Sequence, residues 1–298
     1  MTQGLSPTAA SMAAPATAAP RGLQRVLAVL RWPPLRLVLG IAWMAGWLWL
    51  ASRLKPLLPP QPPGLLMPVM VLAALLGYLS FVVVLEGRRP VELLHRAAVP
   101  ELLAGTLLGV ALLSTTLGLM ALLGVFSITG INPEAALWPI LAESVMAGVV
   151  EELIVRGLVF RILEQWLGSW VALALSAALF GALHLFNPHA TLFSALAIAL
   201  EAGVMLAAAF VLTRRLWLPI GIHLGWNFAQ GGLFGVATSG KAYTGWLQGK
   251  LQGPELLSGG AFGAEGSVVA LAVCLSAGLV LLWRARVAGQ LRPGPWAR

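Results

Sequence analysis

The stretch Val149-Val150-Glu151-Glu152-Leu153-Ile154-Val155-Arg156 places three ionisable residues inside a run that is otherwise apolar from about residue 135 to residue 163. An apolar run of this length can cross a bilayer as a helix. An ionised side chain at bilayer depth is costly unless it is paired or faces a cavity. Two adjacent carboxylates and an arginine therefore indicate a functional site, and the rest of the chain is interpreted as the scaffold around it.

The whole chain has the composition of a polytopic membrane protein. Of its 298 residues, 59% are hydrophobic and 10% are charged, whereas a soluble domain carries about 25% charged residues. The long apolar segments suit helices better than the alternating strands of a barrel. The net charge of +8 does not indicate nucleic-acid binding, because the basic residues cluster in short loops between apolar runs. The single cysteine, Cys274, excludes an intrachain disulfide and a cysteine-based metal site.

We expect an all-α fold with eight membrane-spanning helices in one membrane domain, residues 35–286. Residues 1–20 are predicted to be a disordered tail, because they are rich in Ala, Pro, Thr and Ser. Residues 21–34 are either a basic helix on the membrane surface or an ordinary basic flank of the first span. Residues 287–298 are a predicted cytoplasmic tail. The predicted spans are 35–54, 65–85, 102–126, 135–163, 169–186, 191–213, 216–236 and 267–283.

The distribution of basic residues predicts the orientation. With the N-terminus in the cytoplasm, fourteen of the 19 lysines and arginines lie on the inner side and four on the outer side, while Arg156 lies within a span. This asymmetry favours cytoplasmic termini and an even number of spans. The inner set is Arg21, Arg25, Arg31, Arg36, Arg88, Arg89, Arg96, Arg161, Arg214, Arg215, Arg284, Arg286, Arg292 and Arg298, and the outer set is Arg53, Lys55, Lys241 and Lys250.

The two adjacent glutamates are expected to have different environments. Glu152 and Arg156 are four residues apart, so they share a helix face and can form an ion pair. Glu151 lies about 100° around the helix and is less directly neutralised. Two neighbouring carboxylates in a low dielectric tend to differ in proton affinity, as a general base requires. The alternative is a structural ion pair, which would not need the second glutamate. Glu143 and Glu201 are the main other ionisable residues at membrane depth, and neither is given a role.

Two later apolar runs carry polar pairs with the same spacing. Phe180 and His184 are four residues apart, as are His223 and Asn227. His223 and Asn227 share one helix face and can both donate hydrogen bonds, which suits stabilisation of an oxyanion. Each pair alone has a structural alternative, because polar residues also hold membrane helices together. Polar sites on three separate helices favour one shared functional site.

The pattern Glu151-Glu152-x-x-x-Arg156, Phe180-x-x-x-His184 and His223-x-x-x-Asn227 resembles the three signature motifs of a family of intramembrane proteases. This is the CAAX prenyl protease and bacteriocin-processing (CPBP) family, also called the Abi or type II CAAX endopeptidase family. Each motif is weak alone, but three in order on consecutive apolar segments are specific. The resemblance covers about residues 135–230, the expected catalytic core. It extends loosely through 231–240 and 259–267 and does not include residues 1–60.

The resemblance implies hydrolysis of a peptide bond by water within the membrane. By position, Glu151 would be the general base and His184 would orient the attacking water. His223 and Asn227 would stabilise the tetrahedral oxyanion. The supporting residues would be Glu152, Arg156 and Phe180, the first two holding the site or touching the substrate.

A metal is the open question about cofactors. Members of the family are often labelled metalloproteases, and Glu151, His184 and His223 could supply three ligands to zinc. Against this, the sequence has no H-E-x-x-H helix and asparagine is a poor zinc ligand. We expect catalysis by glutamate without a metal.

The implied partners are membrane lipid and a peptide or membrane-protein substrate, which could be lipidated. The implied location is the inner membrane of a prokaryote, and no nucleic-acid partner is expected. Intramembrane glutamate and histidine also build proton relays, so a proton-coupled transporter or a non-catalytic scaffold is the alternative. A transporter would usually show internal repeats or broken helices, and the complete motif set favours hydrolysis.

The predicted topology raises a geometric problem. It places His223 near the inner end of its span, Glu151 nearer the middle and His184 near the outer end. Either the helix that carries His184 is short and ends within the membrane at residues 186–188, or the helices tilt around a water-filled cavity. We expect the short helix.

Overall fold

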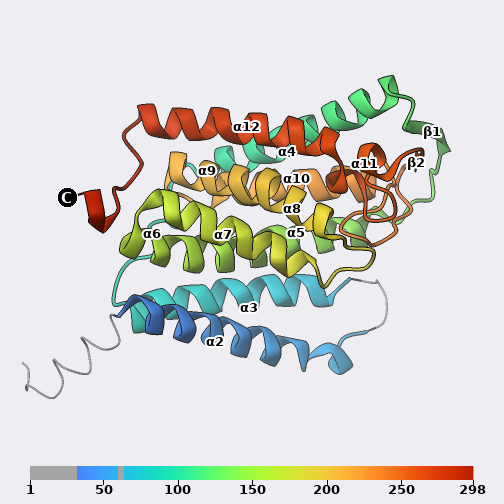
Figure 1. Cartoon of the computed structure of the whole chain (residues 1–298). Helices are drawn as coiled ribbons and strands as arrows, with labels where there is room; N and C mark the ends of the chain where they lie inside the picture. The colour runs from blue at the N-terminus through green and yellow to red at the C-terminus, as the bar shows by residue number, and fades with distance from the viewer. Residues whose placement is uncertain (1–31, 60–63, 298) are drawn as a thin grey trace, which may run out of the picture.

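The computed structural model describes residues 32–59 and 64–297, and Figure 1 shows its helices packed side by side. The predictions for residues 1–20 and for 21–31 lie outside the described residues. The elements are α2 (Pro33–Ser52), η1 (Lys55–Leu57), α3 (Leu66–Ser80), η2 (Phe81–Leu85), α4 (Ala98–Leu122), β1 (Phe126–Ile131), α5 (Leu137–Glu152), η3 (Leu153–Phe160), α6 (Arg161–Leu167), α7 (Ser169–His184), α8 (Leu192–Ile198), η4 (Ala199–Gly203), α9 (Val204–Thr213), α10 (Trp217–Asn227), η5 (Phe228–Leu233), β2 (Leu247–Leu251), α11 (Glu255–Ser258), η6 (Ala264–Gly266), α12 (Val268–Val287) and η7 (Pro295–Ala297).

The chain is a polytopic membrane protein, as predicted. In the part of the chain that the structure describes, five helical runs are long and apolar enough to cross a membrane, and the apolar helix α7 is shorter. Two further runs, α5–η3–α6 and α10–η5, cover the predicted spans 135–163 and 216–236. The five long runs are Pro33–Leu57, Leu66–Leu85, Ala98–Leu122, Leu192–Thr213 and Val268–Val287.

Within the described residues, the structure is mostly helical, and it adds one two-stranded sheet that the predicted all-α fold did not include. The predicted span 102–126 is a helix only to Leu122, because the chain turns at Gly124, whose φ of +74° is a conformation that glycine adopts at low cost. The strand β1 follows directly. It pairs antiparallel with β2, with Phe126 opposite Leu251. The glycine-rich loop 237–266 is therefore tied to the end of α4.

The helix α10, which carries His223 and Asn227, packs closely against α4 through glycines. Gly221 and Gly225 face Gly105 and Thr106, and a Cβ atom added at Gly225 would lie 2.2 Å from the carbonyl oxygen of Thr106. Small residues four apart let membrane helices approach until their backbones touch. His223 lies between these two glycines in sequence, so the α4 contact fixes the helix that presents it.

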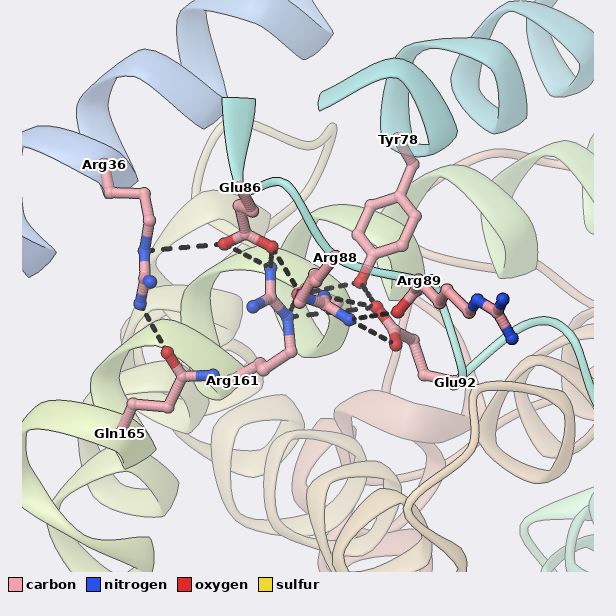
Figure 2. A network of polar contacts seen from close by, with 9 residues as sticks. Arg36, Tyr78, Glu86, Arg88, Arg89, Glu92, Arg161 and Gln165 are labelled. Carbon is pink, nitrogen blue, oxygen red and sulfur yellow. Dashed lines mark hydrogen bonds and ion pairs between the residues drawn. The ribbon is translucent and has the colours of Figure 1, made fainter. Parts of the chain in front are cut away.

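A buried polar network joins the bundle at the end where α2 begins (Figure 2). We call it the arginine–glutamate network. Arg161 Nη2 lies 2.9 Å from Glu86, and Arg88 Nη2 lies 2.7 Å from Glu92. Burial alone would raise the pKa of Glu92, but hydrogen bonds from Arg88 and Tyr78 hold that pKa below its usual value. The members are Arg36, Tyr78, Glu86, Arg88, Glu92, Arg161 and Gln165.

The segment after α12 returns to the same end of the bundle. The backbone N–H of Ser169 donates to the carbonyl of Arg292 (3.0 Å), and the guanidinium of Arg292 lies 3.6 Å from Glu164. Arg214 also pairs with Glu164, at 2.5 Å. The predicted C-terminal tail is thus packed against the start of α7.

Candidate active site

The predicted site residues come together at one cavity, which we call the polar chamber. Glu151 lies at the end of α5, His184 is the last residue of α7, and His223 and Asn227 lie on α10. The chamber has an empty volume of about 580 Å³. Its lining is Glu143, Ser144, Ala147, Glu151, His184, Asn187, His223, Asn227, Thr238, Ser239, Lys241 and Tyr243.

Glu152 is buried, does not line this chamber, and contacts two side chains, those of Arg156 and His223. Arg156 Nη1 donates to Glu152 Oε1 at 2.8 Å, which is the ion pair that the i, i+4 spacing predicts. The same oxygen lies 3.0 Å from Nδ1 of His223, a contact that sequence reasoning missed. Arg156 Nη2 donates to the carbonyls of Ala202 and Gly203, at 3.1 and 3.2 Å. Glu152 therefore fixes the histidine of α10, while Arg156 ties η3 to η4.

The contact with Glu152 orients the His223 ring. Glu152 Oε1, which accepts from Arg156, also accepts a hydrogen bond from Nδ1–H of His223. The other ring nitrogen, Nε2, then faces Glu151, whose Oε2 lies 3.9 Å away. A carboxylate at Nδ1 also stabilises the doubly protonated ring, so His223 can present an N–H donor to the polar chamber.

His184 is oriented by its own helix. Its Nδ1 lies 2.8 Å from the carbonyl oxygen of Phe180. A carbonyl only accepts, so Nδ1 carries the proton, and Nε2 of the neutral ring is free to accept. The Phe180 ring packs near three of these polar groups: its centroid is 4.7 Å from that of His184 and 6.1 Å from that of His223, and the Arg156 guanidinium lies 4.6 Å away.

The two adjacent glutamates differ sharply in exposure. The side chain of Glu151 is 37% exposed and that of Glu152 is 0% exposed. Within the described part of the chain, no hydrogen bond engages the Glu151 carboxylate, and its Oε2 is buried without a partner. Glu151 is thus a carboxylate that a water molecule can reach and that still has acceptor capacity.

Residues from the start of the loop 237–266 line part of the polar chamber. Lys241 Nζ lies 2.5 Å from Glu143 Oε1, and the Tyr243 hydroxyl donates to Glu143 Oε2 at 2.9 Å. Burial and the neighbouring Glu143 carboxylate raise the pKa of Tyr243. Neither this loop nor Glu143 had an assigned role in the sequence analysis. The only signal was that Glu143 lies eight residues, about two helical turns, before Glu151.

The predicted metal ligands do not form a metal site. Among residues 32–59 and 64–297, no group of three or more His, Cys, Asp or Glu side chains could hold a metal ion. Glu151, His184 and His223 line one chamber, and the contacts at Nδ1 leave Nε2 of each histidine without a hydrogen bond to the described residues. As placed, these three residues do not form a group that could hold a metal ion, and no step below is routed through a metal.

The central part of the chain matches a known family. The matching family is described as "Type II CAAX prenyl endopeptidase Rce1-like". The match covers residues 133–229. The resemblance to the type II CAAX, or CPBP, family that the three motifs indicate is confirmed. This Rce1-like segment contains Glu151, His184, His223 and Asn227, whereas the loop residues Lys241 and Tyr243 lie beyond it.

One curated relative is similar to part of the chain. The chain is 30% identical over 88 residues to "Putative membrane peptidase YdiL" of Bacillus subtilis (strain 168), covering 30% of this chain and 34% of that protein. The chain thus spans about a third of the length of the curated relative that it matches. No solved structure matches the chain.

Proposed function

We propose that the protein is an intramembrane endopeptidase that hydrolyses peptide bonds with a glutamate-activated water. The observation that carries this proposal is the polar chamber of the Rce1-like segment. In it, the accessible carboxylate of Glu151 meets His184, His223 and Asn227, which come from two other helices. These are the parts that hydrolysis needs: a base, an orienting group and donors for an oxyanion.

In the first step, water is activated between Glu151 and His184. Glu151 removes one proton, and Nε2 of His184 accepts a hydrogen bond from the other O–H. The water oxygen then forms a bond to the carbonyl carbon of the substrate. A positioned base of this kind contributes about 10²- to 10⁴-fold to the rate.

The developing oxyanion is stabilised by donors on α10. The side-chain amide of Asn227 and Nε2–H of the doubly protonated His223 donate to it. Glu152, at Nδ1 of His223, supports the charge on that ring. Glu151 then returns its proton to the amide nitrogen as the C–N bond breaks. The products are a carboxylic acid and an amine.

The expected topology is eight membrane crossings with both termini in the cytoplasm of a prokaryotic cell. It is supported by the basic-residue count and by the course of the described chain, since α2 begins and α12 ends at the same end of the bundle (Figure 1). We propose one membrane domain, residues 35–286, with a catalytic core at about 135–230. The 16 residues of α7 span about 24 Å, less than the roughly 30 Å of hydrocarbon, which supports the interpretation that His184 lies within the membrane.

The proposed substrate is a peptide or the terminus of a membrane protein. The description of the matched family, a CAAX prenyl endopeptidase, makes a prenylated peptide one candidate. An unmodified leader peptide or membrane-protein terminus is the other. Both would reach the site from the membrane.

The proposal is tested with purified protein in detergent and a library of quenched fluorescent peptides. We expect Glu151→Gln and His184→Ala each to lower cleavage at least about 100-fold. Glu134→Gln, a change at an exposed glutamate outside the chamber, serves as the matched control. If both site variants cleave at the wild-type rate, the catalytic assignment is wrong and a scaffold or transporter is favoured. Activity that a chelator abolishes and zinc restores would overturn the metal-free mechanism.

A further inference from the structure

A second, mainly apolar chamber adjoins the polar one. We call it the apolar chamber, and its empty volume is about 450 Å³. It shares His184, His223, Asn227 and Ser239 with the polar chamber, whereas Glu151 lines only the polar chamber. A group that occupies it therefore lies beside the proposed reacting position. The rest of its lining is Phe180, Ile198, Glu201, Ala202, Met205, Leu206, Ile222, Trp226, Glu265 and Cys274.

Glu201, in the π-helical turn η4, is the exceptional residue of this lining. It is 2% exposed, and within the part of the chain that the structure describes its side chain takes part in no hydrogen bond or ion pair. Its Oε2 is buried without a partner. Buried polar groups are nearly always hydrogen-bonded, and an unpaired one is costly. The carboxyl group of Glu201 therefore has capacity for a partner that enters the chamber.

The other carboxyl group in the chamber is already occupied. Glu265 accepts hydrogen bonds from the side-chain amide of Gln230, from the backbone N–H of Ser239 and from the Ser239 hydroxyl (3.1 Å). Burial raises the pKa of Glu265. Gln230 and Ser239 thus leave Glu201 as the acceptor that an incoming group would meet.

We propose that the apolar chamber is a specificity pocket for a basic side chain of the substrate, lysine or arginine, with Glu201 as its carboxylate partner. This assignment rests on the proposed peptidase function. The aliphatic part of a lysine or arginine would pack on Ile198, Met205 and Leu206, as long basic side chains do on apolar surfaces. Its charged head would form a charge-assisted hydrogen bond with Glu201.

The unpaired carboxyl group favours a basic side chain over an apolar one. A leucine or a norleucine in the chamber would seal Glu201 from water without giving it a donor. A buried site built for a hydrogen bond discriminates strongly against a ligand that lacks the group. We therefore expect roughly a 10- to 100-fold preference for lysine over norleucine, the range for one charge-assisted hydrogen bond.

The test compares pairs of quenched peptides that differ only by lysine or norleucine at one of the two positions flanking the scissile bond. The wild-type protein should prefer lysine at one of these positions in kcat/KM. Glu201→Gln should lower that preference at least about tenfold, and Glu201→Leu should bring it to about one or below. Glu134→Gln, the matched control, should retain it. Melting temperatures establish which variants are folded. If Glu201→Gln does not fold, Glu201→Leu provides the test of the preference.

A binding measurement separates this inference from the proposed function. Fluorescence anisotropy gives the affinity of each peptide for the Glu151→Gln protein and for the Glu151→Gln/Glu201→Gln double variant. If the lysine and norleucine peptides are cleaved with equal kcat/KM, the proposed specificity pocket is wrong, whereas the proposed peptidase function is supported. If no peptide is cleaved, a lysine preference in binding that the double variant loses still supports the pocket. Equal affinities for the two peptides would overturn it.

Discussion

Two buried clusters of arginine and glutamate can be compared in this protein, the arginine–glutamate network and the candidate site. In the network, both oxygens of Glu86 and both oxygens of Glu92 have donors, at 2.7–3.0 Å where the donors are Arg88 or Arg161. In the site, Oε2 of Glu151 and Oε2 of Glu152 are both buried without a partner. The carboxylate oxygens of the network all accept from other side chains of the protein, whereas the site retains carboxylate oxygens with no hydrogen-bond donor among the described residues.

This contrast indicates which buried charged groups are candidates for a functional role. A buried ion pair is weak evidence for a site, because it can serve only to join helices. A buried carboxylate with unused acceptors is better evidence, because the protein bears a cost that a ligand or water can offset. The buried Oε2 atoms of Glu151, Glu152 and Glu201 satisfy this criterion, and the oxygens of Glu86 and Glu92 do not.

The largest expected effect comes from breaking the network. Arg161→Met removes a guanidinium that contacts Glu86 at 2.9 Å and donates to the carbonyl of Gly157 at 2.7 Å. We expect a loss of about 3–5 kcal/mol of stability, because a buried carboxylate loses a partner. Thermal unfolding in detergent measures it. Arg89→Met, at an exposed arginine whose side chain points away from the network (Figure 2), is the matched control. Equal melting temperatures for the two variants would contradict a structural role of the network.

The next effect is on catalysis rather than stability. Asn227→Ala removes a neutral donor from the polar chamber, and we expect kcat to fall about 10²- to 10³-fold, as for other oxyanion donors. The melting temperature should change little, since no hydrogen bond of the described residues engages the Asn227 side chain. Peptide cleavage and thermal unfolding measure the two quantities on the same sample. A variant that unfolds early yet cleaves normally when folded would assign Asn227 to structure.

Helical spacing accounts for how much of the site could be predicted. The i, i+4 pairs Glu152–Arg156 and Phe180–His184 are contacts within one turn, so the sequence alone predicts them. The same reasoning separated Glu151 from Glu152. The contact between His223 and Glu152 joins residues 71 positions apart, and no local pattern encodes it.

The fold was predictable to a similar degree. Apolar runs indicated a polytopic helical protein, and the short helix that ends at His184 was expected from the mismatch in depth. The strand pairing of β1 with β2 was missed, because both strands are short and each contains a glycine, which weakens a strand pattern. The partner of Glu143 was missed for a related reason: Lys241 lies 98 residues away, in a loop whose path depends on that strand pairing.

A smaller effect should appear when pH is lowered, and it tests the network through Glu92. The pKa of Glu92 is below its usual value of 4.5 in the folded protein, so ionised Glu92 stabilises the fold above the unfolded pKa. This contribution is lost as pH falls through the folded pKa. The melting temperature of the wild type should therefore drop below about pH 4.5 more steeply than that of Glu92→Gln. Parallel curves for the two proteins would show that the network does not depend on the charge of Glu92.

The smallest expected effect concerns the loop whose first residues line part of the polar chamber. Lys241 contacts Glu143 at 2.5 Å, but its side chain is 58% exposed, and exposed ion pairs contribute only about 0–1 kcal/mol. We expect Lys241→Met to leave the melting temperature nearly unchanged, in contrast to Arg161→Met. Glu143→Gln should also have a small effect, because the Tyr243 hydroxyl can still donate to the amide oxygen. A loss of stability as large as that of Arg161→Met would mean that the loop, and not only the helix bundle, holds the site together. The Lys241–Glu143 contact would then have to be counted with the arginine–glutamate network as a structural ion pair.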